Sequence, residues 1–398
     1  MTSRDEAGSA SPSSSDPVLG RFETTLRGLE RKARLRALAP RAGLDFASND
    51  YIGLASAPRM VDAVRGALDN GTPVGAGGSR LLRGNTPEHE ALEEAAARLF
   101  RVEKVLLFGG GYVANFAVLT TLPQKGDLLI LDEKIHASAH EGARAGRALA
   151  VEAAHNDVNA FEDRIREWRA AGGTGRVWIT VESVYSMDGD IAPLDELMAL
   201  ADRYDAFLFV DEAHATGVYG PDGRGLTAPF EGRENVLVLH TCGKALGSSG
   251  ALVAGAKVLC DFMVNRARPF IYATAPSPLV AVATQEALAI LQDEPERREK
   301  LARLVAFAGQ ELERTGLAAK GVKASGTQIQ PVIVGENARA MALAATLQAR
   351  GFDVRGVRPP TVPEGTARLR ISLTLNVDEA AVTRLFDALV DEWERGGA

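Results

Sequence analysis

The sequence predicts an α/β fold, with a large domain on a mainly parallel central sheet and a smaller C-terminal α+β domain. Three observations lead to this prediction. Short apolar runs alternate with helical stretches through the first two thirds of the chain. After about Pro276 the pattern changes to long helices with a few strands. The length of 398 residues suits one large and one smaller domain better than a single core.

Five apolar runs are expected to form strands of the large sheet. Each is short and bounded by polar turns, which is typical of strands that are buried on both faces. The helical segments between the runs imply right-handed crossovers and therefore parallel neighbours. The runs span residues 105–108, 128–131, 177–181, 207–210 and 236–239.

Helical spacing of apolar residues predicts helices over 59–68 and 87–99, and Thr86 before Pro87 resembles a capped helix start. Strands over 330–334 and 367–373 are expected in the smaller domain. The small and polar residues of the N-terminus predict a disordered tail. The expected organisation is a tail over 1–17, an N-terminal segment over 18–50, a large domain over 51–275 and a C-terminal α+β domain over 276–398.

Composition excludes several classes of function. The formal net charge is -7 and no long Lys/Arg run occurs, so nucleic acid is not the expected partner. Cys242 and Cys260 are the only cysteines, too few for a secreted disulfide scaffold. No apolar run has the length of a membrane span, and the N-terminus lacks a signal pattern. We therefore expect a cytoplasmic protein that does not bind membranes.

Lys244 follows the last apolar run and lies among small residues. Most lysines are solvated surface residues, and that is the alternative interpretation. The glycines on either side leave room for a flat ligand, and the Thr241 hydroxyl suits a phosphate. Lysine amines form Schiff bases with pyridoxal phosphate (PLP) where their surroundings lower the pKa. This stretch therefore indicates a PLP site.

Asp211 ends another apolar run, at the point where open α/β sheets bind ligands. PLP needs an acid beside its pyridine nitrogen, and His214 could reach the phenolic oxygen of the ring. Alternatively, Asp211 caps the next turn and His214 is structural. The combination of both residues with Lys244 is more specific than either residue alone.

Further candidates follow other strands. Glycines 109–111 lie between a strand and a helix and are typical of a phosphate site, or of a plain tight turn. His136 could stack on the cofactor ring, and Ser186 could bond the cofactor or His214. Asp188 and Asp190 would also suit a metal ion, but no partner cluster supports one, so no metal is predicted.

Arg368 and Arg370 share one face of a predicted strand. The guanidinium fork suits a substrate carboxylate. We expect one of the two arginines to bind it and the other to be a solvated charge.

Taken together, these stretches resemble the α-oxoamine synthase family of fold-type-I PLP enzymes, from about Arg34 to Trp393. Besides the motifs above, residues 46–54, 77–80, 268–274 and 358–363 carry the resemblance. The first stretch recurs across the family. The last looks characteristic of the branch that joins L-alanine to a pimeloyl thioester. The chain departs from the family pattern at Gly110, Ile135 and Ser183.

The resemblance implies a role for each candidate. Lys244 is the covalent anchor of PLP, and Asp211 is the partner of the ring nitrogen. His136, the third expected catalytic residue, stacks on the ring. The remaining expected cofactor contacts are Gly111, Tyr112, Ser186, His214, Thr241 and Thr274. Asn49 and Arg370 are expected to bind the amino-acid carboxylate, and Arg36 and Thr361 the acyl group. Family members are homodimers with shared sites, so Thr274 is expected to serve the partner's phosphate.

The expected reaction is decarboxylative condensation of L-alanine with a pimeloyl thioester, carried by coenzyme A or an acyl carrier protein. Three alternatives stay open. Another member of the family would use glycine or serine with a different acyl group. A different chemistry on the same fold would be that of an aminotransferase or an aldolase. A non-catalytic subunit should have lost Lys244 or Asp211, and both are present.

Overall fold

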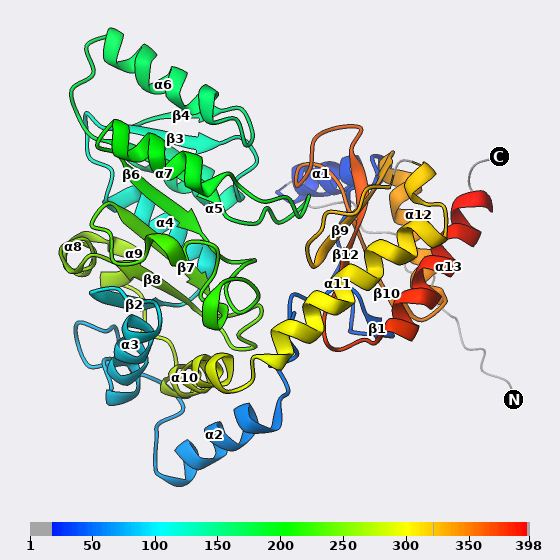
Figure 1. Cartoon of the computed structure of the whole chain (residues 1–398), viewed down its shortest axis with the longest axis horizontal. Coiled ribbons are helices and arrows are strands. Elements are labelled where there is room, and N and C mark those ends of the chain that lie inside the picture. Colours follow the sequence, from blue (N-terminus) through cyan, green and yellow to red (C-terminus); the bar gives the residue numbers. More distant parts are fainter. Residues whose placement is uncertain (1–17, 321, 396–398) are drawn as a thin grey trace, which may run out of the picture.

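A seven-stranded sheet forms the centre of the first part of the chain, in a computed structural model that describes residues 18–320 and 322–395. The strand order is β2-β8-β7-β6-β5-β3-β4 (Figure 1). The strands are β2 (Lys104–Phe108), β3 (Leu128–Asp132), β4 (Leu149–Ala153), β5 (Val177–Glu182), β6 (Phe207–Asp211), β7 (Val236–Thr241) and β8 (Ala251–Gly255). Strands β3 to β7 pair in parallel, and β8 is antiparallel to both of its neighbours. The mainly parallel sheet is confirmed, and each of the five apolar runs forms a strand.

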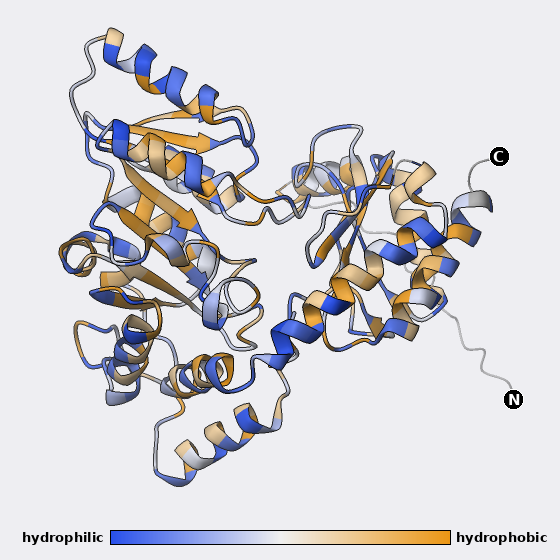
Figure 2. Ribbon diagram, in the orientation of Figure 1, coloured by the Kyte–Doolittle hydropathy of each residue, from blue (hydrophilic) through white to orange (hydrophobic). Residues whose placement is uncertain are grey.

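Helices cover both faces of this sheet, which is why its central strands are largely apolar. In β3, Leu129 and Leu131 belong to the apolar cluster that includes α4, whereas Leu128 and Ile130 belong to the cluster on the opposite face. Figure 2 shows the apolar strands between helices that carry polar residues along their length. The helices are α4 (Gly111–Thr121), α5 (Ala137–Ala145), α6 (Val158–Ala170), α7 (Leu194–Arg203), α8 (Lys257–Arg266) and α9 (Arg268–Ile271).

A second, antiparallel sheet has the order β11-β12-β9 and uses β9 (Ile329–Gly335), β11 (Arg355–Val357) and β12 (Ala367–Ser372). The two strands expected in this region are therefore confirmed as β9 and β12. Helices α11 (Glu296–Arg314), α12 (Asn337–Ala349) and α13 (Glu379–Arg395) share its apolar core. Strand β1 (Leu44–Asp45) pairs in parallel with β10 (Phe352–Asp353). The residues that follow β1 are thereby joined to the C-terminal part of the chain.

The remaining helices are α1 (Gly20–Arg31), α2 (Pro58–Asp69), α3 (Pro87–Leu99) and α10 (Pro278–Asp293), with short 3-10 turns at Pro221–Gly223, Ala228–Phe230 and Ala318–Lys320. The helices expected over 59–68 and 87–99 are confirmed as α2 and α3. Helix α10 packs against both of them, and the long α11 leads on to the second sheet (Figure 1). The domain boundaries stay predictions, and the tail over 1–17 lies outside the described residues. Within the part of the chain that the structure describes, no helix is long and apolar enough to cross a membrane.

Candidate active site

Polar side chains gather where the parallel strands β5, β6 and β7 end. Glu182 and Asp211 are the last residues of β5 and β6 and are direct partners in the strand register. Thr241 ends β7, and Lys244 follows it. The carboxyl ends of parallel strands meet at one edge of a sheet, which is where such sheets bind ligands.

The amine of Lys244 lies inside this cluster, so Lys244 is not the solvated surface lysine that its residue type alone would favour. Its Nζ is 2.8 Å from Nε2 of His214. Burial lowers the pKa of Lys244 to about 8, against the opposing effect of the Asp211 and Glu182 carboxylates. More of this amine is therefore unprotonated near neutral pH than in an ordinary lysine, and the unprotonated form is the one that a nucleophile or a base requires.

Asp211 is buried, and both of its carboxylate oxygens are hydrogen-bonded. Oδ2 accepts from Nδ2 of Asn115 at 2.7 Å, and Oδ1 accepts from the backbone N–H of Ala213 at 2.9 Å. One oxygen therefore stabilises the following turn while the other faces Asn115. The same Asn115 nitrogen lies 3.0 Å from the Ser138 hydroxyl, which is 2.8 Å from Nδ1 of His136. Asp211 and His136 are thus linked through two intervening side chains.

His214 connects Lys244 to the residues expected at the amino-acid carboxylate. Its Nδ1 lies 2.6 Å from the hydroxyl of Tyr51, which donates to Oδ1 of Asn49 at 2.9 Å. Arg370 donates to the same Asn49 oxygen at 3.1 Å. Burial holds the pKa of His214 well below its usual range, so the ring is neutral and relays hydrogen bonds between its two nitrogens.

The glycines before α4 form an open cradle beside Thr241. No side chain caps the N-terminus of α4, so its backbone N–H groups are free to bind an anion. A Cβ on Gly111 would lie 2.7 Å from Oγ1 of Thr241, whereas a Cβ on Gly109 or Gly110 would meet no atom within 4 Å. The next residue, Tyr112, turns its ring edge-on to His136, with the ring centroids 6.4 Å apart. The residues expected at the phosphate are therefore brought together.

The two arginines of β12 have different partners. Arg370 donates through Nε to the Ser186 carbonyl at 2.6 Å and through NH1 to the Ser372 hydroxyl at 2.8 Å. Arg368 forms an ion pair with Asp188. Only Arg370 reaches Asn49. The expectation that the other arginine is a solvated charge is wrong, because Arg368 is only 4% exposed.

Three other expected residues lie outside this cluster. Arg36 donates to the hydroxyl of Thr361 at 3.3 Å, so the pair expected at the acyl group does meet. Thr274 is exposed, and its backbone forms a β-bridge with Ser79 in the 77–80 loop. The structure thus joins two of the motifs that carry the resemblance without bringing Thr274 into contact with Lys244.

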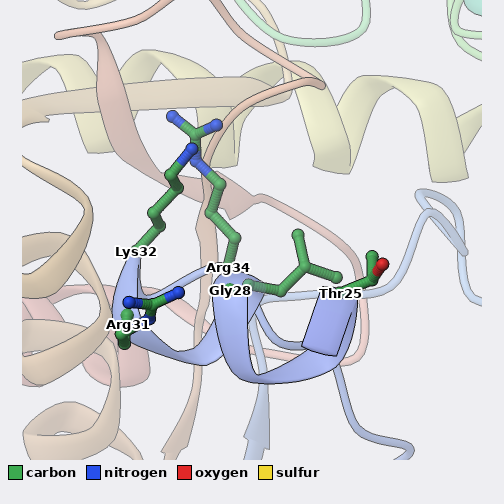
Figure 3. A pocket seen from close by; sticks show the side chains of 6 residues that line it. Thr25, Gly28, Arg31, Lys32 and Arg34 are labelled. Carbon is green, nitrogen blue, oxygen red and sulfur yellow. The ribbon is translucent and has the colours of Figure 1, made fainter. Parts of the chain in front are cut away.

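A cavity of about 520 Å³ opens beside α1 (Figure 3). None of the expected site residues lines it. Its lining residues are Thr25, Gly28, Leu29, Arg31, Lys32 and Arg34.

Asp188 and Asp190, the alternative metal ligands, each face a cationic side chain. Asp188 binds Lys134 and Arg368, and Asp190 binds His155. Among residues 18–320 and 322–395, no three His, Cys, Asp or Glu side chains are grouped to hold a metal ion.

Comparison with known proteins gives a consistent result. Residues 41–389 match the model of the aminotransferase class I and II family. An 8-amino-7-oxononanoate synthase of Chromobacterium violaceum is 43% identical, over 94% of this chain and 97% of that protein. A variant of the serine palmitoyltransferase from S. paucimobilis, solved with a bound PLP–myriocin aldimine, superposes with a TM-score of 0.85 at 25% identity, covering 96% of this chain and all of that one. The 8-amino-7-oxononanoate synthase of Francisella tularensis has a TM-score of 0.73 at 26% identity, covering 89% of this chain and 99% of that one.

Proposed function

Because the chain belongs to the aminotransferase class I and II family, we propose that it is a PLP-dependent acyltransferase that condenses L-alanine with a pimeloyl thioester. The products are 8-amino-7-oxononanoate, carbon dioxide and free thiol, which places the reaction in biotin biosynthesis. The single observation that carries the proposal is the similarity to an 8-amino-7-oxononanoate synthase along nearly the whole chain. The arrangement of side chains at the strand ends supports it.

The residues at the strand ends fit PLP. The glycine cradle before α4 has free backbone donors and open space for a phosphate, with the Thr241 hydroxyl beside it. Asp211 offers a buried carboxylate for the pyridine nitrogen, and Lys244 offers an amine for the aldehyde. We propose that Gly111, Tyr112, Ser186, His214 and Thr241 complete the contacts, with His136 against the ring.

When bound, PLP supplies an electron sink for the electron pair released at the amino-acid Cα. The protein supplies orientation. We propose that Arg370 and Asn49 bind the carboxylate of L-alanine. The bonds from Arg370 to Ser186 and Ser372 leave its NH2 group directed toward Asn49. A fixed carboxylate determines which Cα bond can be broken.

Lys244 is the proposed base. Its Nζ takes the Cα proton of the amino acid, because a pKa of about 8 leaves part of the amine unprotonated. His214, 2.8 Å away, holds this nitrogen in place. Overall, a bond forms between Cα and the thioester carbonyl carbon, and the carbon–sulfur bond breaks to release thiol. The bond from Cα to the carboxylate then breaks to release carbon dioxide, and a proton returns to Cα.

The acyl group is assigned to Arg36 and Thr361, which meet at 3.3 Å. A guanidinium and a hydroxyl suit the polar far end of a pimeloyl chain. The carrier is coenzyme A or an acyl carrier protein, and both forms of the thioester belong in the assay.

We propose a homodimer in which Thr274 serves the phosphate of the neighbouring subunit. The segment with Thr274 and the residues on either side of the 77–80 loop carry exposed apolar side chains. Tyr272 is 73% exposed, Leu82 86% and Val74 69%. Large apolar side chains exposed together are typical of an interface.

A second candidate is condensation of serine with a long acyl thioester, favoured by the higher TM-score of the serine palmitoyltransferase. The sequence identity favours the first candidate, at 43% against 25%.

A thiol-release assay distinguishes these functions. Purified holoenzyme is tested with alanine, glycine and serine, each combined with acetyl, succinyl, pimeloyl and palmitoyl thioesters. Alanine with pimeloyl should give the highest kcat/KM, and its margin over glycine is limited to about 1–3 kcal/mol because one methyl group distinguishes them. If serine with palmitoyl or glycine with a short acyl group ranks first, the family assignment stands and the proposed reaction is wrong. If no combination of amino acid and thioester releases thiol, the protein is a non-catalytic subunit.

A further inference from the structure

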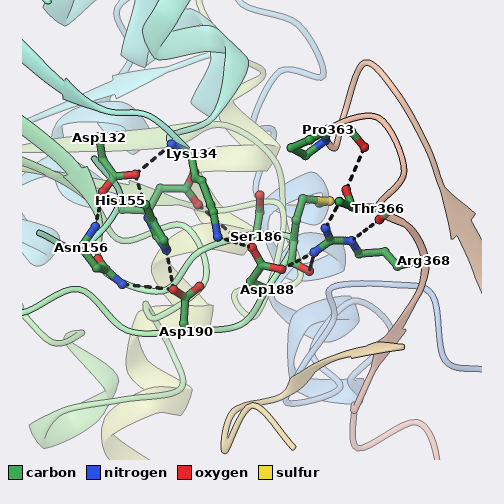
Figure 4. Close-up of polar contacts among 12 residues, drawn as sticks. Asp132, Lys134, His155, Asn156, Ser186, Asp188, Asp190, Pro363, Thr366 and Arg368 are labelled. Atoms are coloured by element: carbon green, nitrogen blue, oxygen red, sulfur yellow. Dashed lines mark hydrogen bonds and ion pairs between the residues drawn. The ribbon is translucent and has the colours of Figure 1, made fainter. Parts of the chain in front are cut away.

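A histidine outside the motifs that carry the resemblance lies between two aspartates (Figure 4). Nδ1 of His155 is 2.9 Å from Oδ1 of Asp132, and Nε2 is 2.5 Å from Oδ2 of Asp190. The Asp132 side chain is fully buried, and that of His155 is 12% exposed. A carboxylate only accepts hydrogen bonds, so both ring nitrogens of His155 must donate, which requires the imidazolium form.

The surroundings of His155 favour this cation. Burial alone would lower the pKa of His155, but the bonds to Asp132 and Asp190 raise it to about 9. The ring of Tyr185 meets that of His155 edge-on, with centroids 4.4 Å apart. The next residue, Asn156, donates from its backbone to Asp132 at 2.9 Å and from its side chain to Asp190 at 3.1 Å. His155 and Asn156 therefore join the end of β3 to the loop after β5.

That loop is a closed turn over residues 185–190. Tyr185 donates from its backbone N–H to the carbonyl of Asp190 at 2.9 Å, and Gly189 donates back to the carbonyl of Tyr185 at 2.9 Å. Because the turn is closed on itself, a bond that holds Asp190 also fixes the residues within the turn.

The same turn supports the arginines of β12. The carbonyl of Ser186 accepts from Arg370 at 2.6 Å, and the carboxylate of Asp188 pairs with Arg368. Lys134, just after β3, donates to Asp188 at 2.9 Å (Figure 4). The turn therefore lies between the end of β3 and the guanidinium of Arg370.

We propose that His155 is a positioning residue for the amino-acid substrate, because it ties the 185–190 turn to Asp132 and thereby holds the Ser186 carbonyl that orients Arg370. His155 touches neither the proposed substrate nor the cofactor contacts. The inference rests on the proposed function only where it assigns the amino-acid carboxylate to Arg370.

His155→Gln is the direct test, in the full-length holoenzyme. Glutamine offers no positive charge, so Asp132 and Asp190 lose their shared counter-charge. The KM for L-alanine should rise about tenfold, the scale of one lost charge-assisted hydrogen bond, while kcat changes less. Hydrogen exchange of the 185–190 backbone amides should become faster, while exchange within β6 stays unchanged.

Two further variants complete the test. Asp190→Asn removes only the outer carboxylate, whose side chain is 38% exposed, and should shift KM and exchange in the same direction to a smaller extent. This variant decides the question if His155→Gln fails to fold. Asp62→Asn is the control, because Asp62 is an exposed aspartate that forms an ion pair with Arg65 on α2, at 2.7 Å. Its KM and exchange should equal those of the wild type.

The imidazolium is tested separately by nitrogen NMR of histidine-labelled protein. His155 should remain doubly protonated at pH 8, and a neutral ring at that pH would overturn the inference. Faster exchange with an unchanged KM would also overturn it, since His155 would then be structural only. If the wild type turns over no amino acid, the proposed function fails, while the exchange and NMR measurements still decide whether His155 holds the turn.

Discussion

Tyr51 is the residue that links the cofactor end of the site to the amino-acid end. It is fully buried, and its hydroxyl lies between His214 and Asn49. The phenol has one proton, which it shares between the Asn49 oxygen and Nδ1 of His214. The choice determines whether Nε2 of His214, the nitrogen that faces Lys244, carries the ring proton. A change in protonation at Lys244 can therefore be matched by a shift along this chain of hydrogen bonds.

Asp211→Asn should preserve the fold and reduce turnover. Asparagine has nearly the same shape and can still accept from Ala213. It lacks the charge that stabilises a protonated pyridine nitrogen, so kcat should fall about a hundredfold or more. Steady-state kinetics measures the fall in kcat, and the midpoint of thermal unfolding shows whether the fold is preserved. Near-normal kcat would remove Asp211 from the proposed mechanism.

At the scale of single residues, the motifs could be predicted from the sequence, but the contacts between their side chains could not. Lys244, Asp211 and His214 could be identified because each follows an apolar run within a few residues. Asn115 and Tyr51 were not predicted as contacts, although Tyr51 lies within residues 46–54 and Asn115 lies four residues after the glycines at 109–111. Nothing local indicates that Asn115 reaches Asp211 from α4, since that contact depends on how α4 packs on the sheet. The meeting of Asp132, His155 and Asp190 depends on the strand order in the same way.

Among the elements, the N-terminus of α4 carries the proposed phosphate site. Gly111→Ala should weaken PLP binding about tenfold, because the new Cβ would lie 2.7 Å from the Thr241 hydroxyl and one of the two must move. Absorbance titration of the apoprotein with PLP measures the Kd. Gly309→Ala in α11 is the control, since a Cβ there would meet no atom within 4 Å. Equal Kd values for the two variants would contradict the proposed phosphate site.

Strands were predictable where they are apolar along their whole length. Two strands of the large sheet were missed for different reasons. Strand β4 is an edge strand whose residues are mostly exposed, so it lacks the continuous apolar pattern. Strand β8 is fully buried but built largely from Ala and Gly, which have low strand propensity. Its antiparallel direction depends on the topology of the whole sheet.

For the whole molecule, the raised pKa of His155 predicts that the folded state becomes less stable at alkaline pH. Its pKa is raised from an unfolded value near 6.5 to about 9, so folding takes up a proton between these values. The contribution of His155 to the free energy of unfolding is complete below pH 6.5 and is lost as the pH rises toward 9. This contribution is at most about 3 kcal/mol. The groups that face the ring are Asp132, Asp190 and Tyr185.

Denaturant unfolding of the wild type and His155→Gln at pH 6 and pH 9 tests this prediction. The difference in unfolding free energy between the two proteins should be larger at pH 6. An equal difference at both pH values would show that His155 is not held as a cation.

The dimer is the second property of the whole molecule. Sedimentation should show a two-chain particle at assay concentrations, because the loops around Val74, Leu82 and Tyr272 leave apolar side chains exposed on the single chain. A fully active monomer would contradict the shared site at Thr274. The sequence indicated this arrangement only through the resemblance, since no local pattern specifies a partner.

The most direct test of the proposed reaction is the fate of the alanine carboxylate. The holoenzyme is given pimeloyl thioester and L-alanine labelled with ¹³C in the carboxyl group, and gas and product are analysed by mass spectrometry. Labelled carbon dioxide should appear in equal amount with free thiol, and the product should be unlabelled 8-amino-7-oxononanoate. A product that retains the label, or thiol released without labelled carbon dioxide, would contradict the decarboxylative condensation.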